Sequence, residues 1–409
     1  MTTKSDRKVR VGIVGCGVVA TAYYLPYLAS MPTVEITAVC DIYPERTAAC
    51  GRLFGAKQQF QDYYAMIEQA NLDAVFILTG PGTHVPFTLA AVQAGKHVLL
   101  QKPMATDLTG AQAIVRAVRA AGVVALIEPS SNSLLDPVIP HLRALVRQGV
   151  LGAPYWFSYV DTGPTNYQPS MGGNPYGVGA FYSKDSGGLL FDFPYAPGQI
   201  VSLLGACKSV MGMAKISVPE RFVVPDTGYN TFLSQATNPK RANYWDVVLD
   251  MPKTQHVHME APDNVFALYE MVDGTTGVMH VGRLFHPVLP GVDGGGLRIF
   301  GTEGNLICGA GYEASIISTR KELLPEVAKD GWYHIPVRGD HTQVKWPQPA
   351  PGSFNYYHES TSHFIDCIRT GRDPVVNVEW GLHITEMMHG AIESSRTGTR
   401  YEMVTTVDW

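Results

Sequence analysis

The N-terminal third of the chain alternates between short apolar runs and segments in which apolar residues recur with the period of an amphipathic helix. The apolar runs predict buried strands at residues 9–14, 34–40, 73–78, 97–100 and 123–127. The segments between them predict a first helix that ends near residue 30 and further helices at 44–54, 63–69, 86–94 and 108–121. Since parallel neighbours need crossover helices, this order predicts an α/β fold with a doubly wound parallel sheet of the Rossmann type.

The pattern changes after residue 137. A helix at 137–148 precedes strands of alternating polarity, which we place at 155–160, 209–216, 264–271, 276–282 and 297–300. The dipeptide Asp273-Gly274 predicts a tight hairpin, because glycine tolerates the positive φ of such a turn. Alternating polarity is typical of an open, mostly antiparallel sheet that helices cover on one face. We expect an ordered loop at 166–188 and an insertion or lid at 326–352.

These patterns predict two domains. The first is the Rossmann domain, at residues 1–133, and the second is a C-terminal α+β domain, at residues 134–409. Two helical patterns, at 358–370 and 379–396, end the second domain, and we expect that the helices within 358–396 can pack back on the first domain.

Charge and hydropathy narrow the possible partners. The 409 residues include 31 lysines and arginines and 36 acidic residues, so the formal net charge is −5. Without a basic excess, the sequence predicts no nucleic-acid partner. No apolar run reaches the roughly 20 residues of a membrane helix, so it predicts no membrane partner.

The cysteines and histidines show no metal pattern. The six cysteines are scattered and include no C-x-x-C pair, which predicts reduced thiols and a cytoplasmic protein. Four histidines near predicted strands lack cysteine or paired carboxylate partners, namely His256, His258, His280 and His286. We therefore predict no metal site.

A glycine-rich turn separates the first predicted strand from the first helix. Its G-x-G-x-x-A pattern consists of Gly15, Cys16, Gly17, Val18, Val19 and Ala20. In this pattern Gly15 permits the tight turn, Gly17 lets a pyrophosphate approach the backbone, and Ala20 lets the helix pack closely on the sheet. The alternative interpretation is a glycine turn without a ligand.

An acidic residue stands where this pattern requires one. Asp41 ends the second predicted strand, about 20 residues after the turn, where a carboxylate would hold a ribose 2′-hydroxyl. A carboxylate repels a 2′-phosphate, so NAD is favoured over NADP, although the nearby Arg46 keeps NADP as an alternative.

Two further motifs follow predicted parallel strands, at the strand ends where doubly wound sheets bind ligands. Thr79, Pro81 and His84 follow the strand at 73–78, and Gln101-Lys102-Pro103 follows the strand at 97–100. We expect five of these residues to contact the cofactor, namely Thr79, Pro81, His84, Gln101 and Lys102. His84 can instead simply begin the next helix.

With these motifs the chain resembles the Gfo/Idh/MocA family, whose name refers to glucose-fructose oxidoreductase and inositol dehydrogenase. The resemblance covers the first domain closely and the second more loosely. Family members carry E-K-P where this chain has Gln101-Lys102-Pro103, and there the lysine lies near the nicotinamide and the reacting hydroxyl. The resemblance thus makes Lys102 a catalytic candidate and Gln101 a departure that removes one carboxylate. A solvated surface lysine is the alternative for Lys102.

A second family signature resembles G-G-x-x-x-D-x-G-x-H-x-x-D. Gly187, Gly188 and Asp192 match it, but Ala196 replaces the histidine that acts as general base and Gln199 replaces the final aspartate. Tyr195 is the candidate substitute, because a cation such as Lys102 can stabilise a phenolate. We expect Asp192 to position the sugar or the ammonium. The alternatives are packing for Tyr195 and helix capping for Asp192.

Three residues complete the candidate substrate site. Relatives commonly carry Asn and Arg where this chain has a segment that starts at Glu128 and includes Asn132, and a carboxylate followed by small hydroxyls favours a neutral polyol. Glu128 can equally cap the next turn. Tyr182 belongs to a loop that is rich in aromatic and polar residues, as carbohydrate pockets are.

The resemblance implies an NAD(P)-dependent oxidoreductase that acts by hydride transfer on a secondary hydroxyl of a sugar, cyclitol or glycoside. It also implies a homodimer or homotetramer built through the second domain. Two alternatives stay open. One is a glycoside-cleaving enzyme that uses bound NAD for transient oxidation and elimination, and the other is a non-catalytic regulator that senses a sugar or nucleotide.

Overall fold

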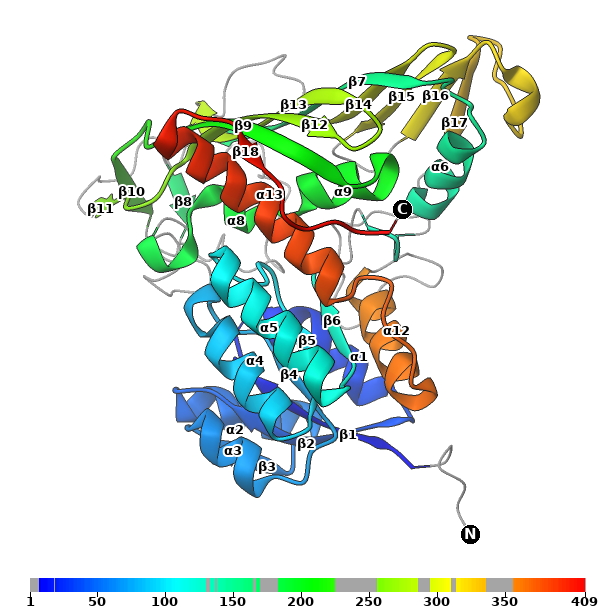
Figure 1. Cartoon of the computed structure of the whole chain (residues 1–409). Coiled ribbons are helices and arrows are strands. Elements are labelled where there is room, and N and C mark those ends of the chain that lie inside the picture. The colour runs from blue at the N-terminus through cyan, green and yellow to red at the C-terminus, as the bar shows by residue number, and fades with distance from the viewer. Residues whose placement is uncertain are drawn as a thin grey trace. The chain divides into compact units, whose positions relative to one another are not determined.

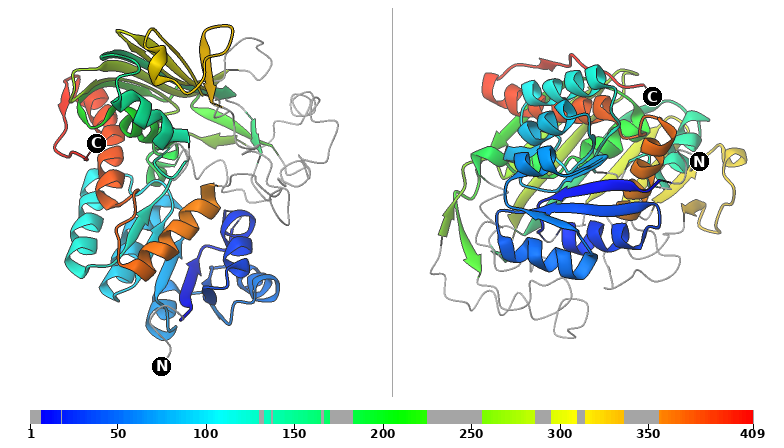
Figure 2. Two further views of the ribbon diagram at one scale, coloured as in Figure 1. Left: turned by 90° about the vertical axis from the view of Figure 1, so that its right-hand side faces the viewer. Right: turned by 90° about the horizontal axis from the view of Figure 1, so that it is seen from below.

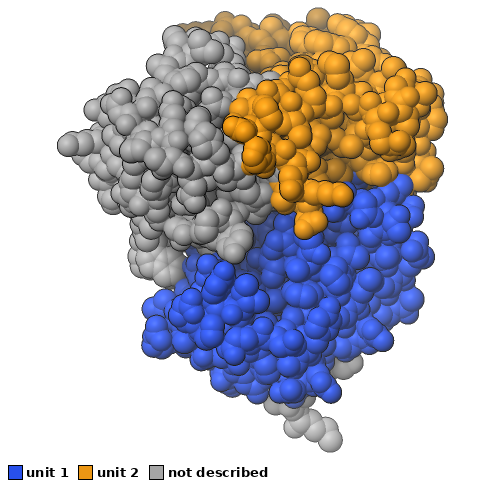
Figure 3. Space-filling model, turned by 90° about the vertical axis from the view of Figure 1, so that its left-hand side faces the viewer, with its two compact units in different colours: residues 1–131, 346–349, 355–385 blue, residues 132–345, 350–354, 386–409 orange. Residues whose placement is uncertain are grey.

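The computed structural model describes residues 7–17, 19–129, 133–136, 138–164, 167–169, 183–224, 256–285, 295–309, 314–335 and 356–408. The chain divides into two compact units (Figure 3). Unit 1 comprises residues 1–131, 346–349 and 355–385, and unit 2 comprises residues 132–345, 350–354 and 386–409. The domain boundary between residues 133 and 134 stays a prediction.

Unit 1 contains a six-stranded sheet in which every pairing is parallel. Its strands are β1 (Val9–Val14), β2 (Val34–Cys40), β3 (Gln58–Phe60), β4 (Ala74–Ile77), β5 (His97–Leu100) and β6 (Ala125–Ile127). Their order across the sheet is β3-β2-β1-β4-β5-β6. This order reverses direction between β1 and β4, so the predicted doubly wound sheet is confirmed (Figure 1).

Helices connect these strands and cover both faces of the sheet (Figure 2). They are η1 (Ala20–Tyr24), α1 (Leu25–Ser30), α2 (Pro44–Phe54), α3 (Tyr63–Gln69), η2 (Pro81–Thr83), α4 (His84–Gln93), α5 (Leu108–Ala121), α12 (Tyr356–Thr370) and the first part of α13 (Val378–Thr397). Local signals set their ends. For example, the side chain of Asp107 accepts a hydrogen bond from the backbone of Gly110 to cap α5, and Gly122 ends that helix in the left-handed conformation.

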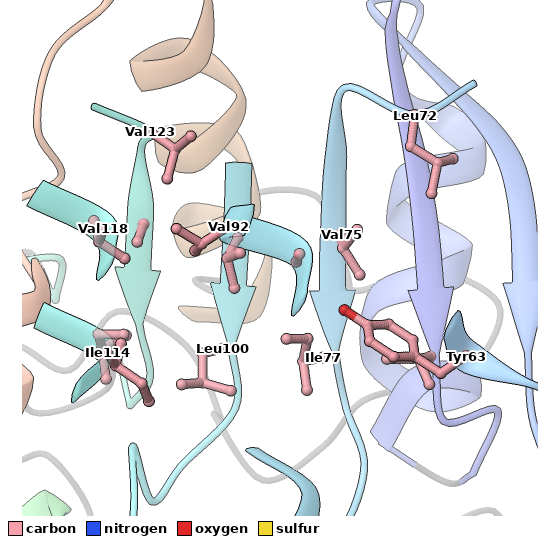
Figure 4. Close-up of a cluster of buried hydrophobic side chains, with 14 of the residues drawn as sticks. Tyr63, Leu72, Val75, Ile77, Val92, Leu100, Ile114, Val118 and Val123 are labelled. Carbon is pink, nitrogen blue, oxygen red and sulfur yellow. The ribbon is translucent and has the colours of Figure 1, made fainter. Parts of the chain in front are cut away.

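Strand residues of alternate parity point to the two faces of this sheet. Val75 and Ile77 of β4 belong to a buried cluster with residues of α3, α4 and α5 (Figure 4). Between them, Phe76 points to the other face, where it packs edge-on against Tyr24 of η1 and Phe364 of α12. Both faces of the strands are therefore buried, as the continuous apolar runs in the sequence predict.

A partly buried ion pair fixes the start of β4 to β1. Asp73 accepts hydrogen bonds from the backbone amide of Arg10 at 2.9 Å and from its guanidinium at 2.7 and 3.0 Å. Arg7 adds a further bond at 2.8 Å. Burial alone would raise the pKa of Asp73, but these donors outweigh it and lower the pKa to about 2.

Unit 2 contains a nine-stranded sheet in the order β17-β16-β15-β14-β7-β13-β12-β9-β18. In chain order its strands are β7 (Pro154–Pro164), β9 (Cys207–Lys215), β12 (Asn264–Met271), β13 (Thr276–Phe285), β14 (Gly296–Gly301), β15 (Gly304–Gly309), β16 (Ala314–Ser318), β17 (Trp332–Ile335) and β18 (Tyr401–Glu402). The pairing of β7 with β13 is parallel, and the other pairings are antiparallel. A mostly antiparallel second sheet is thus confirmed. A small sheet contains β8 (Tyr167–Pro169), β10 (Glu220–Val224) and β11 (His256–His258).

Helices cover one face of the nine-stranded sheet. They are α6 (Val138–Arg147), α8 (Leu189–Asp192), α9 (Tyr195–Leu204) and the last part of α13. At Gly212 of β9 a β-carbon would lie 1.9 Å from the carbonyl oxygen of Ala391, so α13 lies directly on the strand. The predicted hairpin joins β12 to β13, with Gly274 at a φ of 91°. Most of the loop at 166–188 and of the insertion at 326–352 lies outside the described residues.

Among the helices that the structure describes, none is long and apolar enough to span a bilayer.

We predict that Asp73→Asn destabilises the protein by about 1–3 kcal/mol at pH 7, because the pKa shift of this carboxyl is itself a contribution to stability. The folded pKa of Asp73 lies below its unfolded value of 3.8, so the contribution is present above that value and disappears as pH falls towards 2. Urea unfolding between pH 3 and pH 7 measures it. Asp62→Asn is the control, since asparagine also caps α3. A difference from wild type that does not shrink at low pH would contradict the assignment.

Candidate dinucleotide site

The glycine-rich turn packs tightly against its neighbours at Gly15 and borders open space at Gly17. Gly15 has a φ of 91°, and a β-carbon there would lie 2.6 Å from the carbonyl oxygen of Leu78. At Gly17 a β-carbon would meet nothing within 4 Å. The carbonyl of Gly17 accepts the backbone N–H of Thr21 at 3.0 Å, so the first helical turn starts at this open glycine. The space over Gly17 can admit a ligand group close to the backbone.

Asp41 ties this turn to the end of β2. Its Oδ2 accepts the backbone N–H of Cys16 at 2.8 Å, and its Oδ1 accepts that of Tyr43 at 3.0 Å. The guanidinium of Arg46 lies 4.4 Å above the ring of Tyr43, and its Nη1 lies 3.7 Å from Asp41. The carboxylate is therefore held by two backbone amides beside a stacked cation.

Three buried thiols surround the turn, namely Cys16, Cys40 and Cys50. A hydrogen bond with Cys50, together with burial, raises the pKa of Cys16 well above its usual value, and burial raises the pKa of Cys40 to about 12. The thiols of Cys16 and Cys40 thus stay protonated at neutral pH and are poor nucleophiles.

His84 fastens the end of β4 to the turn after β5. The ring is fully buried, with Nδ1 2.7 Å from the carbonyl oxygen of Pro103 and Nε2 3.0 Å from that of Thr79. Burial lowers the pKa of His84, although the two carbonyls favour its protonated form. Contact between His84 and the nicotinamide stays a prediction. Nearby, Thr79 bonds to Thr83 at 2.6 Å, and Pro81 begins η2.

A chain of hydrogen bonds joins the ends of β5 and β6. The backbone N–H of Lys102 donates to Oε1 of Gln101 at 2.9 Å, and Nε2 of Gln101 donates to the hydroxyl of Tyr24 at 3.0 Å. That hydroxyl donates to Oε1 of Glu128 at 2.8 Å. Gln101 and Glu128 are buried, and Tyr24 is fully buried. We call Tyr24, Gln101 and Glu128 the edge triad.

Tyr24 was not among the residues that the sequence pointed to. It ends the five-residue π-helix η1, and its ring packs edge-on against Phe76 at 5.8 Å and Tyr357 at 5.2 Å. A π-turn contains one more residue than an α-turn, so the 3.6-residue period does not give the direction of its side chains. The sequence feature that could have pointed to Tyr24 is the pair of consecutive tyrosines, Tyr23 and Tyr24.

The other expected residues of unit 1 lie at the carboxyl edge of the parallel sheet, except one that is outside the described residues. Val19 begins the first helix, and Lys102 follows β5 with a partly buried side chain. Val18 lies outside the described residues.

In unit 2 the structure describes most of the second signature. Asp192 ends α8 and Tyr195 begins α9, both with partly exposed side chains. Ala196 is fully buried, and Nε2 of Gln199 donates to the thiol of Cys308 at 3.0 Å. Asn132 and Tyr182 lie outside the described residues.

The residues that the structure describes include no group of three or more His, Cys, Asp or Glu side chains placed to hold a metal ion.

A doubly wound parallel sheet with a glycine turn and an acidic residue at the end of β2 defines a dinucleotide-binding protein of the Rossmann class. Residues 9–128 match the model of an oxidoreductase family with an NAD-binding Rossmann fold, the Gfo/Idh/MocA family.

The relatives include two curated proteins and a solved structure. The chain is 32% identical to D-apiose dehydrogenase of Paraburkholderia graminis over 38% of this chain and 40% of that protein. It is 22% identical to scyllo-inositol 2-dehydrogenase (NAD(+)) of Bacillus subtilis over 93% and 94% of the two chains. Levoglucosan dehydrogenase in complex with NADH and L-sorbose has the same fold, with a TM-score of 0.75, 19% identity, and coverage of 97% and 99%. The chain spans about half the length of the first curated relatives that it matches.

We predict unequal effects on stability for alanine at the two glycines of the turn. Gly15→Ala should cost about 2–4 kcal/mol, because it combines a left-handed backbone with a clash against the carbonyl of Leu78. Gly17→Ala should change stability by less than about 1 kcal/mol, because the added methyl meets open space. Thermal and urea unfolding of the ligand-free protein measure both. Equal losses would contradict this description of the turn.

Proposed function

We propose that the protein is an NAD-dependent oxidoreductase that transfers hydride to or from a carbon bearing a secondary hydroxyl on a sugar, cyclitol or glycoside. The observation that carries the proposal is the open space over Gly17, at the same sheet edge as Asp41 and Lys102. The match of residues 9–128 to the family model and the sugar and cyclitol dehydrogenases among the relatives support it.

The residues of unit 1 fit the dinucleotide. Gly15, Gly17 and Val19 offer backbone to a pyrophosphate, and the carboxylate of Asp41 suits a ribose hydroxyl. Thr79, Pro81, His84 and Gln101 are the candidates for the nicotinamide half. When bound, NAD supplies an acceptor or donor of hydride at its nicotinamide ring. We propose NAD over NADP, because the carboxylate of Asp41 repels a 2′-phosphate and Arg46 already stacks on Tyr43.

The remaining steps are assigned to the candidate residues that follow. Tyr195 is the candidate acceptor of the hydroxyl proton, and Lys102 is the candidate cation that lowers the cost of a phenolate. Asp192 is the candidate for positioning the substrate, with Asn132 and Tyr182 as further candidates for binding it. Ala196 has no proton to exchange, and the amide of Gln199 is not a base.

We also propose a homodimer or homotetramer, formed through the uncovered face of the nine-stranded sheet. Neighbouring residues on that face expose apolar side chains, namely Trp156, Met211, Met213, Phe266, Leu268 and Ile307. The pairing register brings Met211 opposite Leu268 and Met213 opposite Phe266, so part of this patch is continuous. Monomeric proteins rarely expose such patches, and a second copy can cover them.

The buried thiols of Cys16, Cys40 and Cys50 support a reducing compartment, and we propose the cytoplasm.

The test of activity starts with the cofactor content of the purified protein and then screens NAD and NADP against free sugars, cyclitols and aryl glycosides. We expect NADH to accumulate with a polyol substrate. Lys102→Ala should lower kcat/KM by about 10²–10⁴-fold. It should leave the Kd for NADH within about threefold, as for an interaction made only during the reaction.

The controls separate the alternatives. Lys96 lies at the opposite end of β5 and donates to the carbonyl of Leu72, so Lys96→Ala should keep full activity. Gly17→Ala should weaken NADH binding about tenfold or more, because a methyl group would occupy the pyrophosphate position. Release of product from an aryl glycoside without accumulation of NADH would indicate the glycoside-cleaving alternative. Binding of NADH without any turnover would indicate a sensor.

We predict that Leu268→Lys dissociates the oligomer, because it places a charge in the exposed apolar patch. Light scattering coupled to size-exclusion chromatography should show a mass that falls to that of one chain. Val272→Lys, in the turn between β12 and β13, is the matched control, since Val272 is also exposed but lies outside the strands. An unchanged oligomer in Leu268→Lys would contradict the proposed interface.

A further inference from the structure

The edge triad has a fixed direction. A carboxylate can only accept hydrogen bonds, so the single proton of the Tyr24 hydroxyl goes to Glu128. The hydroxyl oxygen then accepts from the amide nitrogen of Gln101, which turns the amide oxygen towards the backbone N–H of Lys102. The chain of hydrogen bonds therefore has Glu128 at one end and the backbone of the candidate catalytic residue at the other.

The triad explains why position 101 carries an amide. With carboxylates at both 101 and 128, the hydroxyl of Tyr24 could donate to only one of them, and a second buried charge would lie close to the first. Glutamine avoids both problems, because it donates to Tyr24 and accepts from Lys102. The residue that departs from the family motif is thus the one that the buried Glu128 requires.

The strand register places the two ends of the triad together. Leu100 pairs with Ile127 in the parallel ladder of β5 and β6, so Gln101 and Glu128 follow as neighbours at the carboxyl edge. The backbone N–H of Glu128 donates to the carbonyl of Leu100 at 2.9 Å. A carboxylate at position 101 or at position 128 would therefore lie beside the turn after β5.

The ring of Tyr24 cannot swing away from this edge. It is fully buried between Phe76 of β4 and Tyr357 of α12, and Tyr23 stacks on the same Tyr357 at 4.4 Å. Because the hydroxyl of Tyr24 is fixed, its hydrogen bonds hold the side chains of Glu128 and Gln101 in defined positions.

We propose that Glu128 is a positioning residue that acts through Tyr24 and Gln101 to hold the turn bearing Lys102, in place of a carboxylate at position 101. This inference deepens the proposed function and rests on it for its kinetic test. It replaces direct contact with substrate as the role of Glu128, because the described oxygen of this buried carboxylate points to Tyr24.

The experiment exchanges the carboxylate between strands in the full-length protein. Gln101→Glu gives two carboxylates, Glu128→Gln gives none, and Q101E/E128Q returns one carboxylate on the other strand. Each single variant should lower kcat by about 10- to 100-fold, because Lys102 loses its fixed position. In Glu128→Gln the Kd for NADH should stay within about threefold, because this variant changes none of the residues assigned to the cofactor. The exchanged variant should recover kcat to within about fivefold of wild type.

A pair of tyrosine variants separates positioning from general packing. Tyr24→Phe removes the hydroxyl of the triad and should match the single carboxylate variants. Tyr63→Phe removes a buried hydroxyl that donates to the carbonyl of Phe87 elsewhere in unit 1, and should keep kcat. The proposal would be overturned if kcat of Q101E/E128Q were as low as that of the slower single variant. It would also be overturned if Tyr24→Phe and Tyr63→Phe lowered kcat equally.

Acetylation of Lys102 by acetic anhydride, followed by mass spectrometry, provides a readout that needs no turnover. Loosening of the turn should raise the labelling rate of Lys102 about threefold or more in the single variants, and the exchange should reverse the rise. Lys96 is the internal reference. If wild type binds no NADH or oxidises no polyol, the proposed function fails while the labelling pattern still decides the triad. Equal labelling of Lys102 in all variants would overturn the triad instead.

Discussion

Parallel pairing of β1 with β2 on one side and β4 on the other is the constraint on which unit 1 depends. Because parallel strands end at the same edge, the turns after these strands must share a narrow space. The position of Gly15 shows how narrow it is, since a single added carbon would lie 2.6 Å from the backbone of the neighbouring strand end. Any polar side chain that enters this edge therefore needs a partner within reach.

Three buried side-chain contacts meet that requirement, and each one joins a strand end to its neighbour. Asp41 holds the turn after β1 at the end of β2, and His84 joins the end of β4 to the turn after β5. The edge triad joins the ends of β5 and β6. Backbone amides and carbonyls provide many of these partners, so the edge is shaped before any ligand arrives. Such preorganisation spares a binding site the cost of ordering itself.

The sequence allowed the elements of unit 1 to be predicted where local signals coincide. The bounds of α2, α3 and α5 match because a proline or capping aspartate marks each start. Strand β3 was missed because its residues Gln58 and Gln59 are polar and exposed, and its pairing with β2 comes from a distant part of the chain. Gly17 and Asp41 could be identified because their roles depend on the backbone of a local motif.

Tyr24 could not be identified in this way. Its partners Gln101 and Glu128 are 77 and 104 residues away in the chain, and η1 interrupts the helical period that would have shown its direction. A residue whose role depends on three separate elements leaves no local pattern. His84 was named as a candidate cofactor residue, but its two carbonyl partners become visible only when β4 and the turn after β5 lie together.

The residues that depart from the family motifs lie in two different environments. At position 101 the carboxyl group of the family motif is absent, and Glu128 provides one at the end of the neighbouring strand. At positions 196 and 199 the side chains belong to the interior of unit 2, where Gln199 bonds to a thiol whose pKa burial raises to about 12. Ala196 and Gln199 are both buried, and burying a charge without a partner is costly. The proposed function therefore needs a proton acceptor elsewhere, on a residue that is still partly exposed. Tyr195, in the first turn of α9 and directly before the buried Ala196, meets that condition.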